Sequence, residues 1–417
     1  MAALSSHALA SEDGTTAGAA RMGTMRPLNG ELLLFGYEGR LNAPRIDFHS
    51  STSVLTRLRL SDGNVLSTTL PMARAHYAQQ IGEGLILCVS QNGPTALIVD
   101  SHHQIIRTLN APEGFVYSGH GLVLAHKNVF ALPLCRSVRH DSSAHGAVDI
   151  YDLTDFGLLS RVQQWGINPH ELVYVPGRDE IVVSDYGTLT TFSPPVLSQF
   201  GRPSIFTCDP GTLAVKRVHD QTDLNGAVTH LRVTEQGDAY FVLQQSVFID
   251  IKGHGNRFAA AVLAADEQVS QIFDLPKRDY PLPYIEYEAP EMSVPTPLVR
   301  VNLDSGKRAL FMVKPQFHIR PQSVETNTLT GTVVASYTAS DCLVLQGEGG
   351  SPSVLDGVLL GINQIRGLAD IPGTPYVAVS GSERNVAVVD VDQKEVVGRY
   401  RTRNFAAPHM SFYRGNA

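Results

Sequence analysis

The sequence has few cysteines, no basic run and no apolar stretch long enough to cross a membrane. Its four cysteines are far apart and form no C-x-x-C pair, so they are predicted to be isolated buried thiols. They are Cys88, Cys135, Cys208 and Cys342. The net charge of -7 and the pI near 6.1 argue against nucleic acid or an anionic membrane as the main partner.

Common catalytic motifs are also missing. The sequence has no G-x-S-x-G elbow, no Walker loop, no G-x-G-x-x-G after a predicted strand and no H-E-x-x-H. The glycine-rich run at 347–350 lies between predicted strands and is interpreted as a turn rather than a phosphate-binding loop. The chemistries that depend on these motifs therefore have little support.

The N-terminal segment lacks the features of a secretion signal. Residues 1–29 are rich in Ala, Ser, Gly and Thr, but they contain neither a basic n-region nor an uninterrupted apolar h-region. The sequence as written therefore predicts a flexible tail and a cytoplasmic location.

What the sequence does contain is the pattern of a folded all-β protein. Hydrophobic residues make up 43% of the chain and charged residues 18%, which is typical of a globular protein. From Glu31 onward, short apolar runs are separated by Gly, Pro, Asn and Asp, and almost no stretch keeps a helical period over three turns. The runs come in groups of four, as in the blades of a β-propeller. We therefore predict a single propeller domain over residues 30–417.

Histidine recurs at the start of these groups. His120, His170 and His230 each precede a pair of apolar runs joined by a turn. Most blade-opening positions are about 40 to 50 residues apart, the length that a four-stranded blade needs, so the sequence predicts seven blades. The predicted openings are His76, His120, His170, His230, Gln322, Gln364 and His409.

The last opening lies too close to the C-terminus for a whole blade. Only eight residues follow His409, whereas the apolar runs 31–37, 54–60 and 65–70 precede the first complete blade. We therefore predict that three N-terminal strands pair with the C-terminal strand. This arrangement would close the ring and leave no open edge.

One interval is longer than the others. The excess between His230 and Gln322 falls at 252–297, a segment that contains several prolines and tyrosines. Long insertions of this kind are often lids or surfaces for a protein partner, and a decoration of the blade edge without a direct role is an equally good interpretation.

The histidine positions predict a metal site. The innermost strands of a propeller line its central channel, so residues in one register would converge at the channel mouth. Neutral imidazoles with few carboxylates suit iron, copper, zinc or nickel rather than calcium or magnesium. A single such histidine is more often a hydrogen-bonding bracket between strands, but five in one register favour a functional cluster. The predicted ligands are His120, His170, His230 and His409, with His76 as a fifth ligand or a supporting group.

Other polar residues lie near these positions in the sequence. Glu171 follows His170 and is predicted to accept a hydrogen bond from a neighbouring histidine. Gln322 and Gln364 occupy the same predicted register in the blades without histidine and could hold a water or a substrate. Arg320 and Arg366 flank them and could bind an anionic ligand.

Several of these motifs resemble a known family. Tyr117-Ser118-Gly119-His120-Gly121, Gly166-Ile167-Asn168-Pro169-His170-Glu171-Leu172, Thr229-His230-Leu231 and Pro408-His409-Met410 are similar to motifs of an uncharacterised bacterial propeller family, domain of unknown function 1513. Its members look like relatives of the YVTN propellers and are often encoded beside imelysin-type iron-uptake proteins. The resemblance implies a seven-bladed fold and metal handling or redox chemistry. It also implies a periplasmic location if the true precursor carries a signal.

The sequence thus favours a transition-metal-binding propeller, with iron ahead of copper. As an enzyme it would be an oxidoreductase acting on a small molecule. The alternatives are a metal-free scaffold whose insertion at 252–297 binds another protein, and a propeller-type lactonase or lyase. The last would need carboxylates beside the histidines, and Glu171 is the one evident candidate.

Overall fold

The structure is a computed structural model. The residues that it describes are 28–37, 52–136, 145–187, 196–197, 203–221, 224, 227–244, 247–248, 296–318, 320–382, 384–403 and 405–414. The predicted tail at 1–29 and insertion at 252–297 lie almost wholly outside these ranges. The cysteines are confirmed as isolated buried thiols, and burial raises the pKa of Cys135, Cys208 and Cys342 to about 12.

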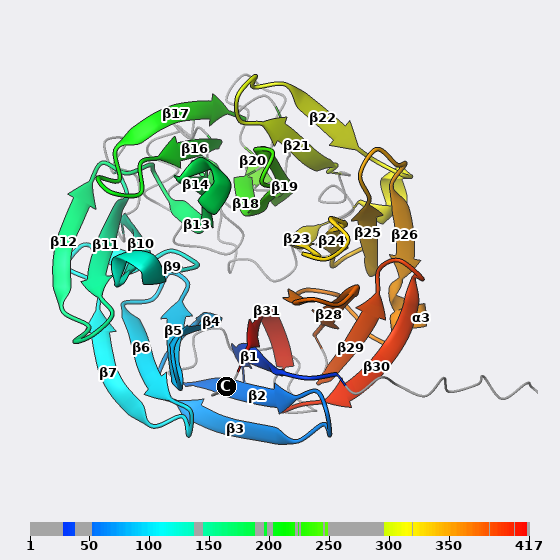
Figure 1. Ribbon diagram of the computed structural model, residues 1–417, viewed down its shortest axis with the longest axis horizontal. Coiled ribbons are helices and arrows are strands. Elements are labelled where there is room, and N and C mark those ends of the chain that lie inside the picture. The colour runs from blue at the N-terminus through cyan, green and yellow to red at the C-terminus, as the bar shows by residue number, and fades with distance from the viewer. Residues whose placement is uncertain are drawn as a thin grey trace, which may run out of the picture.

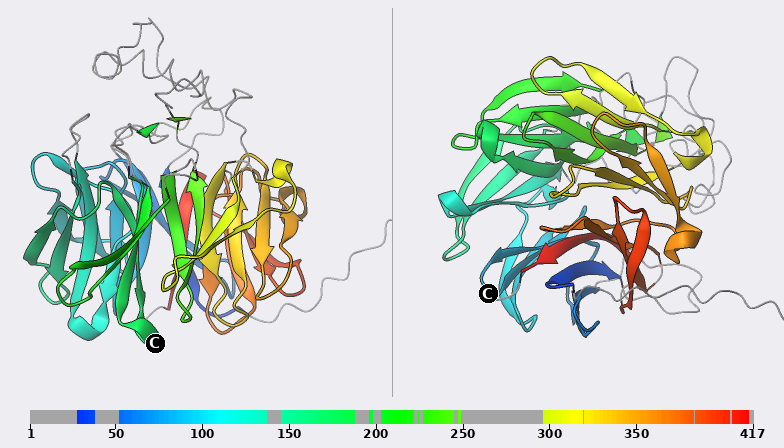
Figure 2. Two further views of the ribbon diagram at one scale, coloured as in Figure 1. Left: turned by 90° about the horizontal axis from the view of Figure 1, so that it is seen from above. Right: turned by 45° about the vertical axis from the view of Figure 1, so that its right-hand side comes forward.

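Seven antiparallel sheets form a closed ring around a central channel (Figure 1). This arrangement confirms the predicted all-β, seven-bladed propeller. Figure 2 shows the strands running between the two faces of the ring. In each blade the innermost strand lines the channel and the fourth strand lies on the rim.

The first three blades, written from the inner to the outer strand, have the following bounds. Blade 1 is β31 (Phe405–Tyr413), β1 (Glu31–Tyr37), β2 (Ser53–Arg59) and β3 (Val65–Leu70). Blade 2 is β4 (Ala75–Gly82), β5 (Leu85–Ser90), β6 (Thr95–Asp100) and β7 (Ile105–Asn110). Blade 3 has a divided inner strand, β8 (Phe115–Tyr117) and β9 (Leu122–Leu124), followed by β10 (Val129–Arg136), β11 (Ala147–Asp152) and β12 (Leu158–Gln163).

The other four blades follow the same order. Blade 4 is β13 (Pro169–Val175), β14 (Glu180–Asp185), β16 (Ser204–Cys208) and β17 (Val215–Asp220). Blade 5 is β18 (Ala227–Val233), β19 (Asp238–Gln244), β21 (Leu298–Asn302) and β22 (Arg308–Phe311). Blade 6 is β23 (Pro321–Thr326), β24 (Val333–Tyr337), β25 (Cys342–Gln346) and β26 (Ser353–Asp356). Blade 7 is β27 (Leu368–Ile371), β28 (Tyr376–Ser380), β29 (Asn385–Asp390) and β30 (Glu395–Arg401).

A few short elements lie outside the blades. A parallel pair joins β15 (Val196–Leu197) and β20 (Val247–Phe248). The helical elements with described bounds are α3 (Gly357–Leu360) and the 3-10 turns η1 (Ala125–Lys127), η2 (Pro176–Arg178) and η6 (Pro315–Phe317). Among the helices in the described ranges, none is long and apolar enough to cross a membrane.

The ring closes as predicted. The C-terminal strand β31 pairs with β1, where His409 lies opposite Phe35 and Met410 opposite Leu34. The two ends of the chain therefore share one sheet. This pairing removes the free strand edges that an open ring would expose.

Alternating side chains explain how the blades stack. In β28, β29 and their counterparts, nearly every residue is buried, because each face of a middle strand packs against a neighbouring blade. The rim strands have one apolar face at most, so Ile106 and Leu159 remain more than half exposed. Burial is thus greatest in the middle strands, whereas the inner strands β13 and β18 combine buried residues with partly exposed ones such as Tyr174 and Arg232.

Candidate metal centre

The inner strands bring five histidines to one place in the channel. They are His76 in β4, His120 between β8 and β9, His170 in β13, His230 in β18 and His409 in β31. The centroid of the His76 ring lies 4.3 Å from that of His409, 5.0 Å from those of His120 and His170, and 6.1 Å from that of His230. The ring geometry of the propeller therefore gathers side chains that are hundreds of residues apart in the sequence.

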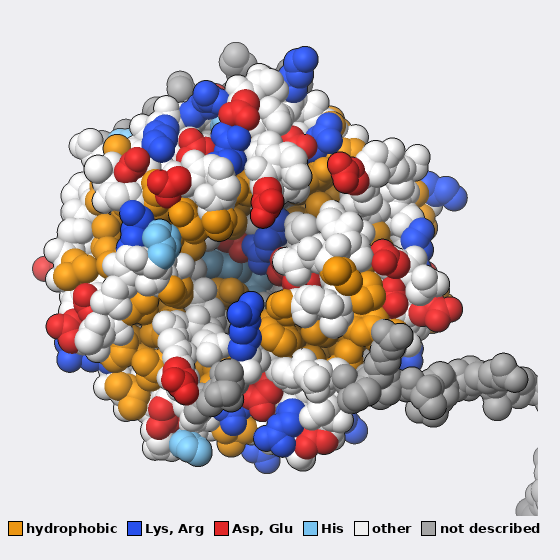
Figure 3. All heavy atoms as spheres, viewed as in Figure 1, with side chains coloured by type: hydrophobic (Ala, Val, Ile, Leu, Met, Phe, Trp, Pro, Cys, Tyr) orange, Lys and Arg blue, Asp and Glu red, His pale blue; other side chains and the backbone are white. Residues whose placement is uncertain are grey.

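The histidines differ in one respect from the prediction. They do not open their strands at the channel mouth. They lie within the inner strands or, for His120, between two of them, and each is at most 4% exposed. Figure 3 shows the centre of the ring as a hollow with histidine side chains at its floor.

Shifts in the strand pairing set the direction of these side chains. The pairing register shifts at His76, at His170 and at Thr229-His230, and a further shift occurs beside His409 on the pairing of β1 with β31. A β-bulge inserts an extra residue and turns its side chain away from the regular alternation. Because such bulges occur at the histidine positions of several inner strands, the imidazoles point into the channel rather than between the blades.

His120 is placed by a break in its strand. The four residues from Ser118 to Gly121 separate β8 from β9, and the His120 N–H donates to the His170 carbonyl oxygen at 2.7 Å. A Cβ atom on Gly119 would overlap the carbonyl group and the Nδ1 atom of His170. Glycine is therefore required for blade 3 to approach blade 4 this closely.

Four of the histidines have the geometry of a ligand set. One imidazole nitrogen from each of His76, His120, His230 and His409 lies within 4.8 Å of the others. His170 is outside this group, although its Nε2 lies 3.2 Å from the Nε2 of His76. The four buried histidines could hold a metal ion, with His170 beside one of them.

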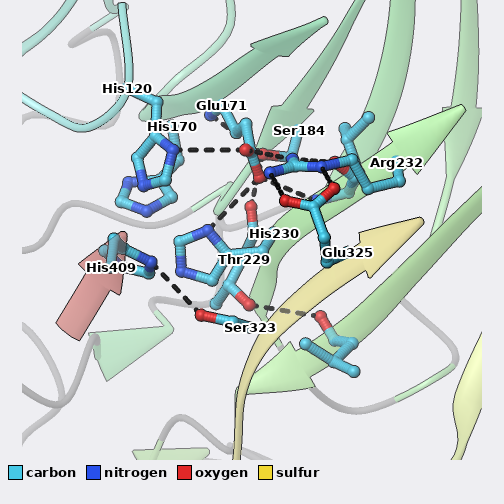
Figure 4. Close-up of polar contacts among 12 residues, drawn as sticks. His120, His170, Glu171, Ser184, Thr229, His230, Arg232, Ser323, Glu325 and His409 are labelled. Atoms are coloured by element: carbon cyan, nitrogen blue, oxygen red, sulfur yellow. Dashed lines mark hydrogen bonds and ion pairs between the residues drawn. The ribbon is translucent and has the colours of Figure 1, made fainter. Parts of the chain in front are cut away.

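The Nδ1 atoms of four of the five histidines each contact an oxygen atom of a neighbouring residue. The Nδ1 of His120 lies 3.2 Å from Glu171 Oε1, and the Nδ1 of His230 lies 3.3 Å from Glu171 Oε2 (Figure 4). The Nδ1 of His170 donates to the Ser118 carbonyl oxygen at 2.5 Å, and that of His409 lies 3.2 Å from Ser323 Oγ.

These contacts fix the protonation of the rings. A carboxylate or carbonyl oxygen only accepts hydrogen bonds, so the neutral rings of His170 and His230 carry their proton on Nδ1. The contact with Glu171 favours the same tautomer for His120, although the geometry at its Nδ1 does not amount to a hydrogen bond within the described residues. Their Nε2 lone pairs are then available to a ligand. The Nε2 atoms of His120 and His409 are buried and make no hydrogen bond within the described residues, which is the state expected of unused metal ligands.

A charged network supports the histidines on one side. Glu171 Oε1 accepts a 2.5 Å hydrogen bond from Arg232 Nη1, and Oε2 accepts a 2.9 Å bond from the Leu231 N–H. Arg232 also donates from Nε and Nη2 to the two oxygens of Glu325, at 2.7 and 3.1 Å. Two carboxylates and one guanidinium thus leave one net negative charge beside the neutral imidazoles, which favours a cation.

Burial keeps the histidines neutral. Desolvation, followed by the charges of neighbouring histidines, holds the pKa of His76, His170 and His409 well below the usual value of 6.5. For His120, desolvation lowers the pKa to about 4, although Glu171 opposes the shift. Burial alone would raise the pKa of Glu171, but Arg232 and the nearby histidines hold it well below 4.5, so its carboxylate stays charged.

This burial predicts that the metal-free protein loses stability in mild acid. The unfolded chain takes up protons on its histidines near pH 6.5, whereas folded His120 does so near pH 4. Stability is therefore complete above pH 6.5 and falls as the pH drops towards 4. For His120 alone the loss between pH 6.5 and 5 is about 2 kcal/mol, from 1.36 kcal/mol per pH unit.

Urea unfolding of the metal-free protein at pH 7 and pH 5 measures this effect. His103 also has a pKa lowered to about 4 and contributes to the total. The variant His120→Gln should therefore show a shallower pH dependence than the wild type, not a flat one. Equal pH dependence in the two proteins would contradict the prediction.

The enclosed space beside the histidines is small. A cavity of about 10 Å³ is lined by Tyr77, His120, Glu171, His230, Arg232, Ser323, Val324, Leu368, His409 and Met410. This volume corresponds to about one water molecule. It fits a single ion and leaves no room for an organic substrate in the conformation described.

The glutamines and arginines predicted to face the ligand do not line this cavity. Gln322 follows Pro321 in β23, but the adjacent Ser323 makes the contact to His409. Gln364 is out of the predicted register, because α3 and the loop after it place this residue before β27, where its Oε1 accepts from the Ser382 hydroxyl. Arg320 precedes β23 with φ of 57°, and the Arg366 carbonyl accepts from the Ser336 hydroxyl.

The sequence prediction missed several residues of the site. Arg232, Ser323 and Glu325 complete the polar network, and Tyr77 stacks on His120 at a centroid distance of 4.1 Å with an interplanar angle of 7°. A usable signal was present for Arg232, which follows His230 by two residues and so shares its side of a regular strand. Nothing comparable in the sequence pointed to Ser323.

Comparisons with known proteins identify no family. No family model matches the chain, and no curated protein matches it. Among solved structures, it is similar to one described as a nidogen/laminin complex, with 8% identity, a TM-score of 0.44 and coverage of 92% of this chain and 98% of that one. It is also similar to the dihydro-heme d1 dehydrogenase NirN in complex with DHE, with 11% identity, a TM-score of 0.49 and coverage of 96% and 78%. At these values neither protein bears on the function of this chain.

Proposed function

We propose that this propeller binds one transition-metal ion in its channel and uses it for oxidative chemistry on a small molecule, for which the 10 Å³ space beside the ion would have to open. His76, His120, His230 and His409 would hold the ion, and His170 would be a fifth ligand or would orient His76. The observation that carries the proposal is the pair of buried Nε2 atoms, on His120 and His409, that have no hydrogen-bond partner within the described residues. Leaving such atoms unpaired is costly unless a ligand satisfies them.

The residues present fit iron ahead of copper. Imidazole nitrogen suits both metals, and the absence of sulfur ligands among the cavity-lining residues, apart from the thioether of Met410, argues against a thiolate site. Zinc in proteins usually takes four ligands, and His170 beside the set of four would give a fifth, which would favour a metal of higher coordination number. When bound, iron or copper would supply one-electron chemistry and an open position for a small ligand such as dioxygen.

The remaining residues have defined roles in this proposal. Glu171 holds the rings of His120 and His230 from their Nδ1 side, which makes both better ligands. Arg232 keeps Glu171 charged and ordered, and Glu325 holds Arg232. Tyr77 and Leu368 close the site with aromatic and aliphatic surface, so that water is largely excluded.

Elemental analysis tests the proposal. Protein purified without added metal, or metal-free protein titrated anaerobically with Fe(II) and then separately with Cu(II) and Zn(II), should hold about one equivalent of ion. The double variant His120→Gln/His230→Gln should hold none. His103→Asn is the matched control, because His103 is buried outside the channel at φ of 62°, which Asn tolerates. Less than about a tenth of an equivalent, with no uptake on titration, would refute the proposal.

A metal-free scaffold is the second candidate. The 3.2 Å contact between the Nε2 atoms of His76 and His170 is a hydrogen bond between blades if no ion is bound, and it favours a bracketing role. In that case His170→Ala would lower the melting temperature equally with and without added metal. A lactonase or lyase has less support, because Glu171, the carboxylate that lines the cavity, is already engaged by Arg232.

A further inference from the structure

A second cavity lies where the ring closes, apart from the histidine cluster. It has a volume of about 350 Å³ and shares no lining residue with the channel site. It is lined by Asn29, Gly30, Glu31, Arg57, Arg59, Ser61, Ser101, Tyr413 and Arg414. In Figure 3, which has the same orientation as Figure 1, Lys and Arg side chains lie among Asp and Glu side chains over β2 and β3 at this side of the ring.

The lining is rich in hydrogen-bond donors and carries positive charge. Three guanidiniums face one carboxylate, that of Glu31, which gives the lining a net charge of about +2. The amide of Asn29 and the hydroxyls of Ser61 and Ser101 add further donors. A cavity with many donors, few acceptors and excess positive charge is suited to an anion.

Glu31 orients two of the arginines. Its Oε2 lies 2.8 Å from Arg57 Nε, and its Oε1 lies 3.3 Å from Arg59 Nε. Arg57 also donates from Nη1 to the Ser101 carbonyl oxygen at 2.8 Å, and Arg59 from Nη1 to Asp62 at 3.2 Å. Each guanidinium has five N–H groups, so both keep donors for a ligand after these bonds are made.

A buried hydroxyl in the lining gives independent support. Tyr413 is 1% exposed, and within the described residues its hydroxyl has no acceptor for its own proton; the neighbouring group is the Arg57 guanidinium, which can only donate to it. A buried phenol without an acceptor is costly, and an anion in the cavity would provide one.

We propose that this cavity binds a small soluble phosphomonoester. The volume falls in the range of small-molecule sites and exceeds what inorganic phosphate needs. The lining is largely polar, which fits a ligand whose other groups are hydroxyls, such as a sugar phosphate. The phosphate would meet Arg57, Arg59 and Arg414, and guanidinium groups match phosphate geometry through paired hydrogen bonds.

A ligand bound in this cavity would also link the strands that close the ring. Glu31 and Arg57 lie on β1 and β2, Tyr413 on β31, and Ser101 in the turn after β6 of the next blade. A ligand that contacts all of these joins the N-terminal and C-terminal strands of blade 1 to blade 2. Because it would bind the folded ring and not the unfolded chain, it should raise the melting temperature in a concentration-dependent way.

Calorimetric titration of the full chain tests the proposal in phosphate-free buffer. The probes are ribose 5-phosphate, ribose, sulfate, and vesicles containing phosphatidic acid. Ribose 5-phosphate should bind and the other three should bind weakly or not at all. The double variant Arg59→Gln/Arg414→Gln should weaken ribose 5-phosphate binding at least about tenfold, since it removes two of the three guanidiniums that would donate charge-assisted hydrogen bonds to the phosphate.

Arg107→Gln is the matched control. Arg107 lies in the rim strand β7 and does not line the cavity, so this variant should bind as the wild type does. Far-ultraviolet circular dichroism establishes that the variants are folded. The proposal is overturned if ribose binds as tightly as ribose 5-phosphate, if sulfate does, or if the double variant is unchanged. Binding to phosphatidic acid vesicles without binding to ribose 5-phosphate would also overturn it.

Discussion

Replacing Glu171 with Gln should both destabilise the protein and weaken metal binding. The two carboxylate oxygens face donors alone: His120 Nδ1 and Arg232 on Oε1, and His230 Nδ1 and the Leu231 N–H on Oε2. Glutamine has the same shape but presents one oxygen and one NH₂ group. Whichever way the amide is turned, a donor meets a donor.

The expected effects are large because the site is buried. Removing one partner of a buried ion pair costs about 3–5 kcal/mol, and here the loss leaves Arg232 with Glu325 alone. Losing the group that fixes a histidine ligand lowers metal affinity by about 10- to 100-fold. Urea unfolding of the metal-free variant measures the first effect, and competition with a chelator measures the second.

Glu325→Gln is the matched control for this experiment. Glu325 is the other carboxylate on Arg232, but it contacts no histidine among the described residues, and its side chain is 12% exposed against 4% for Glu171. The same chemical change should therefore cost less stability and leave the metal affinity within a few-fold of the wild type. If the two variants lose metal affinity equally, Glu171 does not act through the histidines.

The overall fold could be predicted from the sequence because the blade period repeats. Turns and short apolar runs recur along the chain, and the predicted runs 31–37 and 65–70 match β1 and β3. The ring closure followed from counting, since His409 has too few residues after it to complete a blade. The blade count and the ring closure could be predicted because each blade carries its own local sequence pattern.

The convergence of the histidines was predicted, but their depth and pairing were not. Side-chain direction in these strands is set by bulges, and the register shifts at His76 and His170 leave no distinctive residue type in the sequence. The position of Gln364 was also predicted wrongly. The sequence placed it with the inner-strand residues, whereas α3 adds residues before β27 and leaves it in a loop.

The polar network was missed because it joins different blades. Arg232 comes from β18, Glu171 from β13 and Glu325 from β23, three strands that become neighbours only when the ring forms. A sequence pattern within one blade can predict that Arg232 faces the channel. It cannot predict which carboxylates will meet it there.

Gly119→Ala should disrupt the histidine site because the new side chain would collide with the backbone of His170. The added methyl group would overlap the carbonyl group and Nδ1 of His170. Backbone atoms cannot move aside as a flexible side chain can, so blades 3 and 4 must separate. That movement breaks the 2.7 Å bond from the His120 N–H to the His170 carbonyl and the 2.5 Å bond from His170 Nδ1 to the Ser118 carbonyl.

We expect Gly119→Ala to lower the free energy of unfolding by about 1–3 kcal/mol, the usual cost of overpacking. Metal affinity should fall at least about tenfold, because the rings of both His120 and His170 lose their positions. Gly177→Ala is the matched control, since a Cβ atom there meets nothing within 4 Å. Gly177 lies in η2, so its replacement should be neutral or slightly stabilising.

The two alanine variants separate a local effect on the histidines from a general effect of removing glycine. Equilibrium dialysis against Fe(II), with unfolding curves on the same samples, gives both quantities. Gly119→Ala that binds metal as tightly as Gly177→Ala would show that the approach of blade 3 to blade 4 is not needed for the ion. In that event His120 and His170 could not both be held by the contacts described here, and the ligand set would have to be sought among His76, His230 and His409.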